Sequence, residues 1–166
     1  MADQALYLRK IEDADLARLD VWLHKPYILN WYEYPKAWLD EIRQRDDRFS
    51  FISHFIVMAG SHPIGFCQYY DCSHAGEDWY SVWAHAETYS IDYLIGEEAY
   101  LQQGYGKRIV RLLIDAIRAK TTAKEILVQP EKENAASCNT LESCGFVYDK
   151  GKGYYRLLLS FFADKA

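Results

Sequence analysis

Two glycines, Gly104 and Gly106, lie between a strand-like segment and the clearest helical pattern of the chain. The first backbone N–H groups of a helix have no partner within the helix, and the helix dipole adds partial positive charge at the same end. Because glycines carry no side chain, a phosphate group could approach these N–H groups closely. The segment therefore predicts an anion site, although two glycines also suit a tight turn that binds nothing. It is neither a Walker loop nor a dinucleotide fingerprint, because neither glycine spacing is present.

Other kinds of catalytic chemistry have little support in the sequence. The five histidines are dispersed and do not repeat at the helical spacing of metal ligands, so we expect no metal site. No pattern indicates a Ser/His/Asp nucleophile. The four cysteines show neither paired spacing nor nearby histidines, and we expect free thiols.

Charge is distributed unevenly along the chain. The net charge is −5, and residues 49–106 hold seven acids but no Lys or Arg, whereas residues 107–166 hold eleven basic residues and seven acids. A cationic substrate could meet the acidic middle and an anionic cofactor the more basic last third. The bland alternative is that these charges only solvate the surface. The acidic balance argues against nucleic acid as a partner.

Length and composition favour one domain over residues 1–166, because half of the 166 residues are apolar and no linker or repeat divides the chain. The apolar runs are far shorter than the ~20 residues that span a bilayer, so we expect no membrane partner. The first residues lack the basic and apolar regions of a secretory signal, which favours a cytoplasmic location. The sequence leaves a homodimer open.

Hydrophobic periodicity predicts the elements that position the anion site. Residues 87–95 alternate in the period of a strand, with Asp92 among aromatic and aliphatic neighbours. Residues 105–119 carry the buried stripe of a helix, and residues 125–128 form a strand. This spacing is that of a βαβ crossover, so the two strands should be parallel.

The other predicted elements complete an α+β fold with a local α/β unit. The predicted order is β-α-α-β-β-β-α-β-α-β-β, which favours a mixed, mostly antiparallel central sheet flanked by helices. The remaining strands with assigned bounds are 5–9, 50–59, 63–70 and 154–161, and the remaining helices are 13–23, 35–45 and 134–144.

Motifs after the glycines carry a resemblance to a known family. The predicted strand ends at Gln129-Pro130, and the next helix begins near Asn134 and closes at Gly145-Phe146. Together with the two glycines, these residues resemble the acetyl-CoA motif of the GNAT superfamily of N-acetyltransferases. The resemblance implies a three-layer α/β GNAT-like fold, with the parallel βαβ unit at the acetyl-CoA site.

The likeness extends through nearly the whole chain. The segment 92–106, with its Ile95-Gly96-Glu97 step, is closely similar to aminoglycoside 6'-N-acetyltransferases, and so is the early Trp31-Tyr32-Glu33 cluster. The implied cosubstrate is acetyl-CoA, and no metal is implied.

The resemblance also implies roles for individual residues. It places an acidic general base at Asp92, which suits the chemistry because an amine attacks a thioester only after losing a proton. The alternative is a carboxylate that is solvated or paired across the sheet. The backbone of Leu94 and Ile95 would pair with the pantetheine arm, which Asn134 would also contact. The loop amides that would hold the CoA pyrophosphate belong to Gln102, Gln103, Gly104, Tyr105, Gly106 and Lys107.

Three positions depart from the family pattern. Leu101 stands where the motif prefers Arg or Gln, and Leu141 stands where many relatives have a Tyr beside the departing sulfur. A thiol with a pKa near ~8.5 leaves tolerably as a thiolate, so loss of that Tyr need not abolish turnover. Gln129 replaces an Asp that some aminoglycoside enzymes use near the acceptor. As substitutes for the missing Tyr, the sequence does not rank Tyr93, Tyr148 and Tyr154.

The predicted acceptor site consists of Trp31, Tyr32, Trp79 and Gln129. The three rings could form a wall against a sugar or a cation, or could serve ordinary packing. The function implied is transfer of an acetyl group from acetyl-CoA to a primary amine of a small cationic acceptor, with an aminoglycoside as one candidate. Stretches 22–26 and 30–32 also resemble hydroxamate-siderophore acyltransferases. A peptide amine as acceptor and a non-catalytic acyl-CoA sensor are further alternatives.

Overall fold

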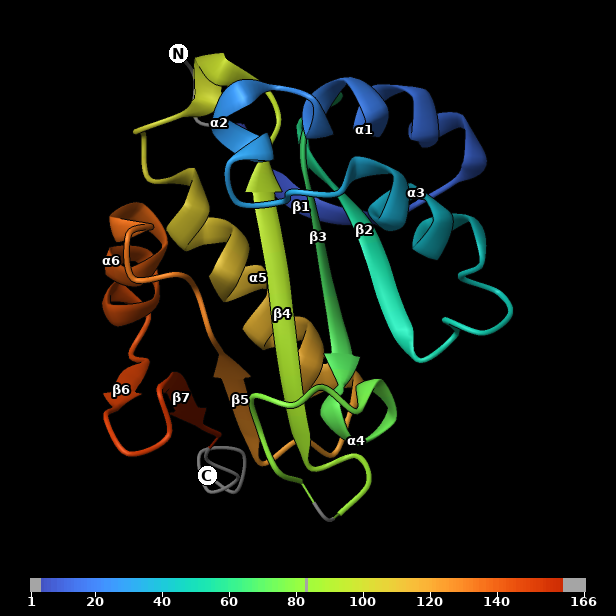
Figure 1. The fold of residues 1–166 in the computed structure, drawn as a ribbon. Coiled ribbons are helices and arrows are strands. Elements are labelled where there is room, and N and C mark those ends of the chain that lie inside the picture. The colour runs from blue at the N-terminus through green and yellow to red at the C-terminus, as the bar shows by residue number, and fades with distance from the viewer. Residues whose placement is uncertain (1–3, 83, 160–166) are drawn as a thin grey trace.

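The computed structural model describes residues 4–82 and 84–159 (Figure 1). Seven strands form one sheet in the order β1-β2-β3-β4-β5-β7-β6. The strands are β1 (Leu6–Lys10), β2 (Ile52–Ala59), β3 (His62–Asp71), β4 (Thr88–Ile95), β5 (Glu125–Val128), β6 (Val147–Asp149) and β7 (Tyr154–Leu158). The helices are α1 (Leu16–Leu23), α2 (Pro26–Leu29), α3 (Pro35–Arg43), α4 (Cys72–Ala75), α5 (Tyr105–Lys120) and α6 (Ala135–Ser143), with 3-10 turns η1 (Asp13–Asp15) and η2 (Glu98–Tyr100).

The sheet is mixed, as predicted. Strands β4 and β5 are parallel and are joined by α5, while the other strand pairs are antiparallel. The parallel pairing covers only residues 88–90 of β4 and 125–127 of β5. Within the described part of the chain, residues 91–95 of β4 therefore have no strand beside them on the β5 side. We call this opening between 91–95, the end of β5 and α6 the notch.

Helices cover both faces of the sheet, which gives three layers (Figure 1). On one face, α5 buries Ile109, Leu113 and Ile117, which recur every four residues and so share one side of the helix. Leu141 of α6 belongs to the same hydrophobic cluster. On the other face, α1 to α3 form a second cluster with side chains of β2, β3 and β4. The predicted three-layer arrangement is thereby confirmed.

Most predicted elements are present with shifted ends. Helix α3 ends at Arg43, two residues before the predicted end, and β2 begins at Ile52 instead of residue 50. The last strand ends at Leu158, and residues 160–161 of its predicted span lie outside the described residues. The sequence did not predict α2 and α4, because helices of four residues are too short to show a period.

Three further features of the described residues concern the thiols, the helix lengths and groups that could hold a metal ion. All four cysteines are free thiols, and Cys67 and Cys72 are buried. None of the helices in the described residues is both long and apolar enough to cross a bilayer. Across residues 4–82 and 84–159, no group of three or more His, Cys, Asp or Glu side chains could hold a metal ion.

Candidate active site

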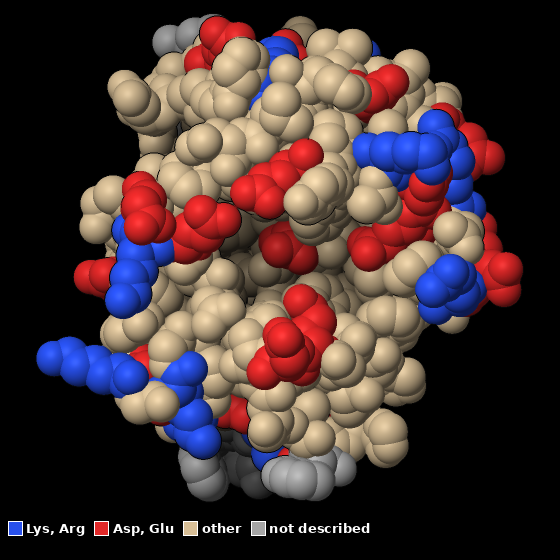
Figure 2. Space-filling view, in the orientation of Figure 1, with Lys and Arg blue, Asp and Glu red and all other residues tan. Residues whose placement is uncertain are grey.

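A cleft of about 780 Å³ opens at the notch. Residues 91–95 of β4, the end of β5 and the loop before α5 form part of its walls. The other walls come from α6 and from the segment 27–38, which includes most of α2 and the start of α3. Figure 2 shows a hollow near the middle of this face, with acidic side chains around it and the Lys and Arg side chains farther away. The cleft therefore joins the predicted anion site to an acidic region.

The loop before α5 presents its backbone N–H groups to one end of the cleft. Gln102 and Gly104 both have left-handed backbone conformations, with φ of 58° and 81°, and α5 begins at Tyr105. Among the described residues, no protein acceptor pairs with the N–H groups of 102–107. Unpaired N–H groups at the start of a 16-residue helix have the arrangement that anion binding requires, and the anion site stays a prediction.

Side chains at this end leave room for a phosphate. A Cβ at Gly104 would meet no atom within 4 Å, and a Cβ at Gly106 would lie 3.6 Å from Thr140 Oγ1. Lys107 lines the cleft and supplies its positive charge. The side chain of Gln103 does not line the cleft, and its amide donates to the carbonyl of Ala99, whereas the role expected of its backbone N–H stays a prediction.

The free edge of β4 provides backbone groups for an extended ligand. A Cβ at Gly65 of β3 would lie 2.3 Å from the Leu94 carbonyl oxygen, so this carbonyl points toward β3. Because the N–H and C=O of one residue point to the same side of a strand and those of the next residue to the other side, the backbone groups of Tyr93 and Ile95 face the notch. Tyr32 and Tyr27 donate hydrogen bonds to their carbonyl oxygens, at 2.6 and 2.8 Å. Of the two residues expected to pair with a pantetheine arm, Ile95 directs its backbone groups to the notch and Leu94 lines the cleft with its side chain, and the pairing itself stays a prediction.

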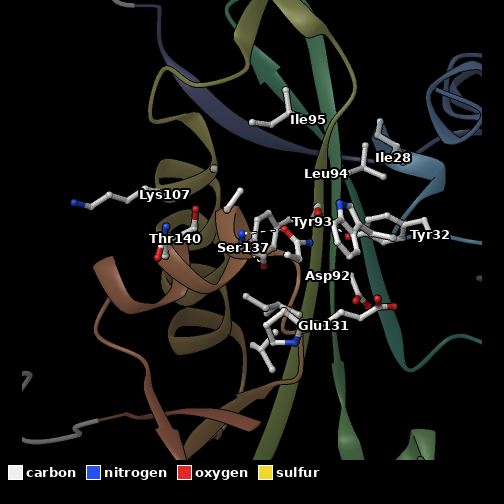
Figure 3. A pocket seen from close by; sticks show the side chains of 18 of the residues that line it. Ile28, Tyr32, Asp92, Tyr93, Leu94, Ile95, Lys107, Glu131, Ser137 and Thr140 are labelled. Carbon is white, nitrogen blue, oxygen red and sulfur yellow. Dashed lines mark hydrogen bonds between the residues drawn. The ribbon is translucent and has the colours of Figure 1, made fainter. Parts of the chain in front are cut away.

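Asp92 lies in the middle of the cleft wall, partly buried, on the face of β4 opposite Tyr93 (Figure 3). Burial raises the pKa of Asp92 to about 7, because it penalises the charged form. A hydrogen bond of 2.9 Å from Gln68 Nε2 to Asp92 Oδ2 opposes this effect, since it favours the carboxylate. The negative charges of Glu77 and Glu41 raise the pKa further. A carboxyl group with a pKa near neutrality is suited to accept and release a proton.

The acceptor end of the cleft combines aromatic rings with acids. Trp31, Tyr32, Trp79 and Gln129, all predicted from the sequence, line the cleft. Trp79 packs edge-on against Tyr80 and donates from its ring nitrogen to Glu77. Gln129 donates to the carbonyl of Gly153, and so already has one protein partner. The charged lining residues are the acids Glu77, Asp92 and Glu131 and the single base Lys107.

Comparison with known protein families identifies this arrangement. The sequence model of the acetyltransferase (GNAT) domain matches residues 12–151, most of the chain. The chain belongs to the GNAT acetyltransferase family. It is therefore an acetyl-CoA-dependent N-acetyltransferase, and the unpaired amides and open space at Gly104 fit the phosphates of this cosubstrate.

Individual relatives are similar at low identity. The aminoglycoside N(6')-acetyltransferase type 1 of Klebsiella pneumoniae is 23% identical over 155 residues, covering 87% of this chain and 75% of the relative. The crystal structure of aminoglycoside acetyltransferase AAC(6')-Ib with coenzyme A has a TM-score of 0.81 at 22% identity, over 96% of this chain and 98% of that one. Spermidine N-acetyltransferase from Vibrio cholerae, solved with CoA and spermine, has a TM-score of 0.71 at 15% identity, over 92% and 95%.

A tyrosine hydroxyl occupies the GNAT cleft although position 141 is Leu. Tyr93 lines the cleft, and its hydroxyl lies 2.9 Å from Ser137 Oγ on α6 (Figure 3). Burial raises the pKa of Tyr93 to about 12, so the hydroxyl keeps its proton at neutral pH. Tyr148 and Tyr154 do not line the cleft, whereas Leu141 is fully buried in the core. The structure therefore ranks Tyr93 first among the tyrosines that the sequence left unranked.

One polar face of α6 was not predicted as part of the site. Ser137, Thr140 and Ser143 line the cleft and recur every three residues, a spacing that could have indicated one helix face. Asn134, which was predicted, lines the cleft and caps α6: its side-chain oxygen accepts from the Ser137 N–H at 3.2 Å.

Proposed function

We propose that this GNAT enzyme acetylates a primary amine of a small polycationic acceptor, with aminoglycosides as the leading class. The observation that carries the proposal is Asp92, a carboxyl group with a pKa of about 7 at the junction of the notch with the acidic end of the cleft. Glu77 and Glu131 add carboxylates where further ammonium groups of the acceptor would lie. The similarity to aminoglycoside and spermidine acetyltransferases, whose acceptors carry several amines, supports the same class.

In the proposed mechanism, Asp92 accepts a proton from the acceptor and Tyr93 donates one to the leaving group. Acetyl-CoA supplies the acetyl group as a thioester. Asp92 accepts the proton that the acceptor ammonium must lose before its nitrogen can attack. The neutral nitrogen then attacks the thioester carbonyl, so that the C–N bond forms and the C–S bond breaks. Tyr93 gives its hydroxyl proton to the departing thiolate and is restored by the second proton, which the nitrogen loses as the amide forms, while Ser137 holds the hydroxyl in place. The N–H groups of Tyr93 and Ile95 would orient the pantetheine arm, and those of 102–107 the pyrophosphate.

An amine panel tests the acceptor class. Release of CoA thiol would be followed with aminoglycosides, linear polyamines, N6-hydroxylysine and a peptide N-terminus. We expect kcat/KM to be highest for an acceptor with three or more amines, because one amine reacts while others remain charged beside Glu77 and Glu131. Preference for N6-hydroxylysine would contradict the proposal and favour siderophore chemistry. Binding of acetyl-CoA without thiol release for any amine would indicate a sensor.

We expect the KM of the acceptor to rise with salt. The charged lining residues of the cleft are three acids and one lysine, so long-range attraction should contribute to binding of a cation. At 1 M ionic strength the Debye length falls to ~3 Å, which screens charges that are not in direct contact. Glu77→Gln should reduce the salt dependence, whereas Asp115→Asn, an exposed acid outside the cleft, should leave it unchanged. A KM that does not vary with salt would argue against electrostatic recognition.

Tyr93→Phe should lower kcat while leaving CoA affinity unchanged. We expect a loss of about 10²-fold, at the low end for a general acid, because a thiol with a pKa of ~8.5 leaves readily even unprotonated. Tyr148→Phe, a hydroxyl outside the cleft, is the matched control. Single-turnover rates and calorimetric titration with CoA provide the two measurements. An unchanged kcat for Tyr93→Phe would mean that the thiolate departs unaided.

A further inference from the structure

Three polar side chains lie side by side across the sheet, on the face that α3 covers. His54 of β2 is the direct cross-strand partner of Gln68 on β3, and Gln68 is that of Asp92 on β4. His54 is only 3% exposed and Gln68 only 2%. From α3, Glu41 approaches His54, with 3.7 Å between Glu41 Oε1 and His54 Nε2. We call these four residues the buried polar row.

On one side of the row, the next neighbours on this face are apolar. They are Ile56, Phe66 and Leu94, which belong to the cluster beneath α1 to α3. On the other side, the same face carries Ile52, Tyr70 and Ser90. The ring of His54 stacks on that of Phe66, with 6.2 Å between the centroids. A line of polar groups through such a cluster carries a desolvation cost that apolar side chains of similar size would avoid. The row therefore calls for a reason other than packing.

Unpaired atoms in the row follow one another in space. Glu41 Oε1, both ring nitrogens of His54, and Gln68 Oε1 are buried without a hydrogen-bond partner among the described residues. Buried polar atoms are rarely left this way. Two of these atoms are acceptors, on Glu41 and Gln68, and an imidazolium ring donates from both of its nitrogens. An imidazolium ring at His54 therefore has the donors that these two acceptors lack, and the 3.7 Å from Glu41 Oε1 to His54 Nε2 means that a small shift of the ring is needed to form the bonds.

The amide of Gln68 has a direction that matters for Asp92. Its Nε2 donates to Asp92 Oδ2 at 2.9 Å, so its oxygen is turned toward the β2 side. If the amide rotated by half a turn, its oxygen would face the Asp92 carboxylate, and two acceptors would repel each other. His54 is the cross-strand neighbour on the β2 side, at the distance over which such pairs interact. With Nε2 of His54 facing Glu41, Nδ1 is the nitrogen left for Gln68.

We propose that His54 is a positioning residue for Asp92 that acts through Gln68. In this proposal a small shift of the His54 ring brings an N–H at Nδ1 onto Gln68 Oε1, so that the Gln68 Nε2–H group stays on the Asp92 carboxylate, while Glu41, 3.7 Å from Nε2, attracts the other side of the ring. The row thereby favours the ionised form of Asp92, against burial and against Glu77. The link to catalysis rests on the proposed role of Asp92 as the base, whereas the effect of His54 on Asp92 does not.

Other groups that face Asp92 keep the same charge in the wild type and in the His54 variants. Tyr32 and Tyr70 are close enough for the Asp92 charge to raise their pKa values, and both keep their protons near neutrality. Glu77 lies on the cleft side and contributes its charge in every variant. A change in the titration of Asp92 when His54 is substituted therefore comes from the buried polar row.

The test is the titration of Asp92 followed by carboxyl 13C NMR, with the signal assigned by its absence in Asp92→Asn. His54→Phe should raise the Asp92 midpoint by about one pH unit, a tenfold change in the ionisation equilibrium, because the Gln68 amide is no longer held. His54→Asn, which keeps a donor near the Nδ1 position, should restore most of the wild-type midpoint. Phe66→Leu perturbs the same packing without a polar change and should leave the midpoint in place.

Either of two results with the variants would overturn the proposal: an unchanged midpoint in His54→Phe, or an equal shift in Phe66→Leu. The 15N NMR signals of the His54 ring can be measured in the unmodified protein. The proposal requires a proton on Nδ1, so a His54 ring that is protonated on Nε2 alone would also overturn the proposal. The pH dependence of kcat/KM separates the positioning role of His54 from the role of Asp92 as the base. If His54→Phe moves the NMR midpoint of Asp92 but leaves the acidic limb of the kcat/KM profile in place, then His54 positions Asp92 but Asp92 is not the base.

Discussion

Asp92→Asn is expected to lower kcat by about 10²–10⁴-fold while changing the affinity for acetyl-CoA little, because Asn keeps the size of Asp but cannot accept a proton. The wild-type kcat/KM should rise with pH through about 7, as Asp92 loses its proton. The defect of the variant should therefore be largest just above pH 7. It should shrink at lower pH, where the wild type loses its base, and at higher pH, where more of the acceptor arrives deprotonated.

A stability measurement separates this catalytic loss from misfolding. Because the pKa of Asp92 is raised in the folded protein above the value in the unfolded chain, ionisation of this group opposes folding as pH rises from about 4 through 7. Asp92→Asn should thus melt at the same temperature as the wild type, or higher, at pH 8. Asp115→Asn makes the same substitution on the exposed side of α5 and should keep full kcat. If Asp92→Asn kept full kcat, Asp92 would not be the general base. If only the KM of the acceptor rose, Asp92 would bind the cationic acceptor without taking its proton.

The sequence predicted those parts of the site that depend on local structure. A helix N-terminus after two glycines specifies an anion site wherever the helix lies, and the βαβ spacing specifies the parallel pair of β4 and β5. The glycine loop was predicted in this way, whereas Asp92 was assigned from the resemblance to the GNAT superfamily. The side chain of Gln103 turns back to Ala99, a contact that no periodicity indicates.

Parts of the site that depend on register could not be predicted. Gln68 and Asp92 are 24 residues apart, and their hydrogen bond exists because β3 and β4 pair with these residues opposite each other. The resemblance assigned a backbone role to Leu94 and Ile95, and the period of two does not tell which residues of β4 direct their N–H and C=O groups to the notch. The Tyr93 hydroxyl reaches the cleft from a different element than Leu141, which only the assembled cleft reveals.

Gly104→Asp is expected to weaken CoA binding by about 10²-fold or more, since a carboxylate within ~5 Å of a phosphate costs on the order of 3 kcal/mol at an effective dielectric constant of about 20. Gly104 has a φ of +81°, and its Cβ position is open, so the new side chain would enter the space in front of the unpaired amides of 102–107. Calorimetric titration with CoA measures the loss.

Gly104→Asn is the matched control for this change, because Asn and Asp have nearly the same shape and both tolerate a left-handed backbone better than other side chains. Any strain at φ of +81° is thus shared, and the difference between the two variants reports charge alone. That difference should shrink at 1 M salt, where the Debye length is ~3 Å. Equal CoA affinity of the folded Asp and Asn variants at low salt would mean that the pyrophosphate lies elsewhere, and the unpaired amides before α5 would then be only the exposed first turn of a helix.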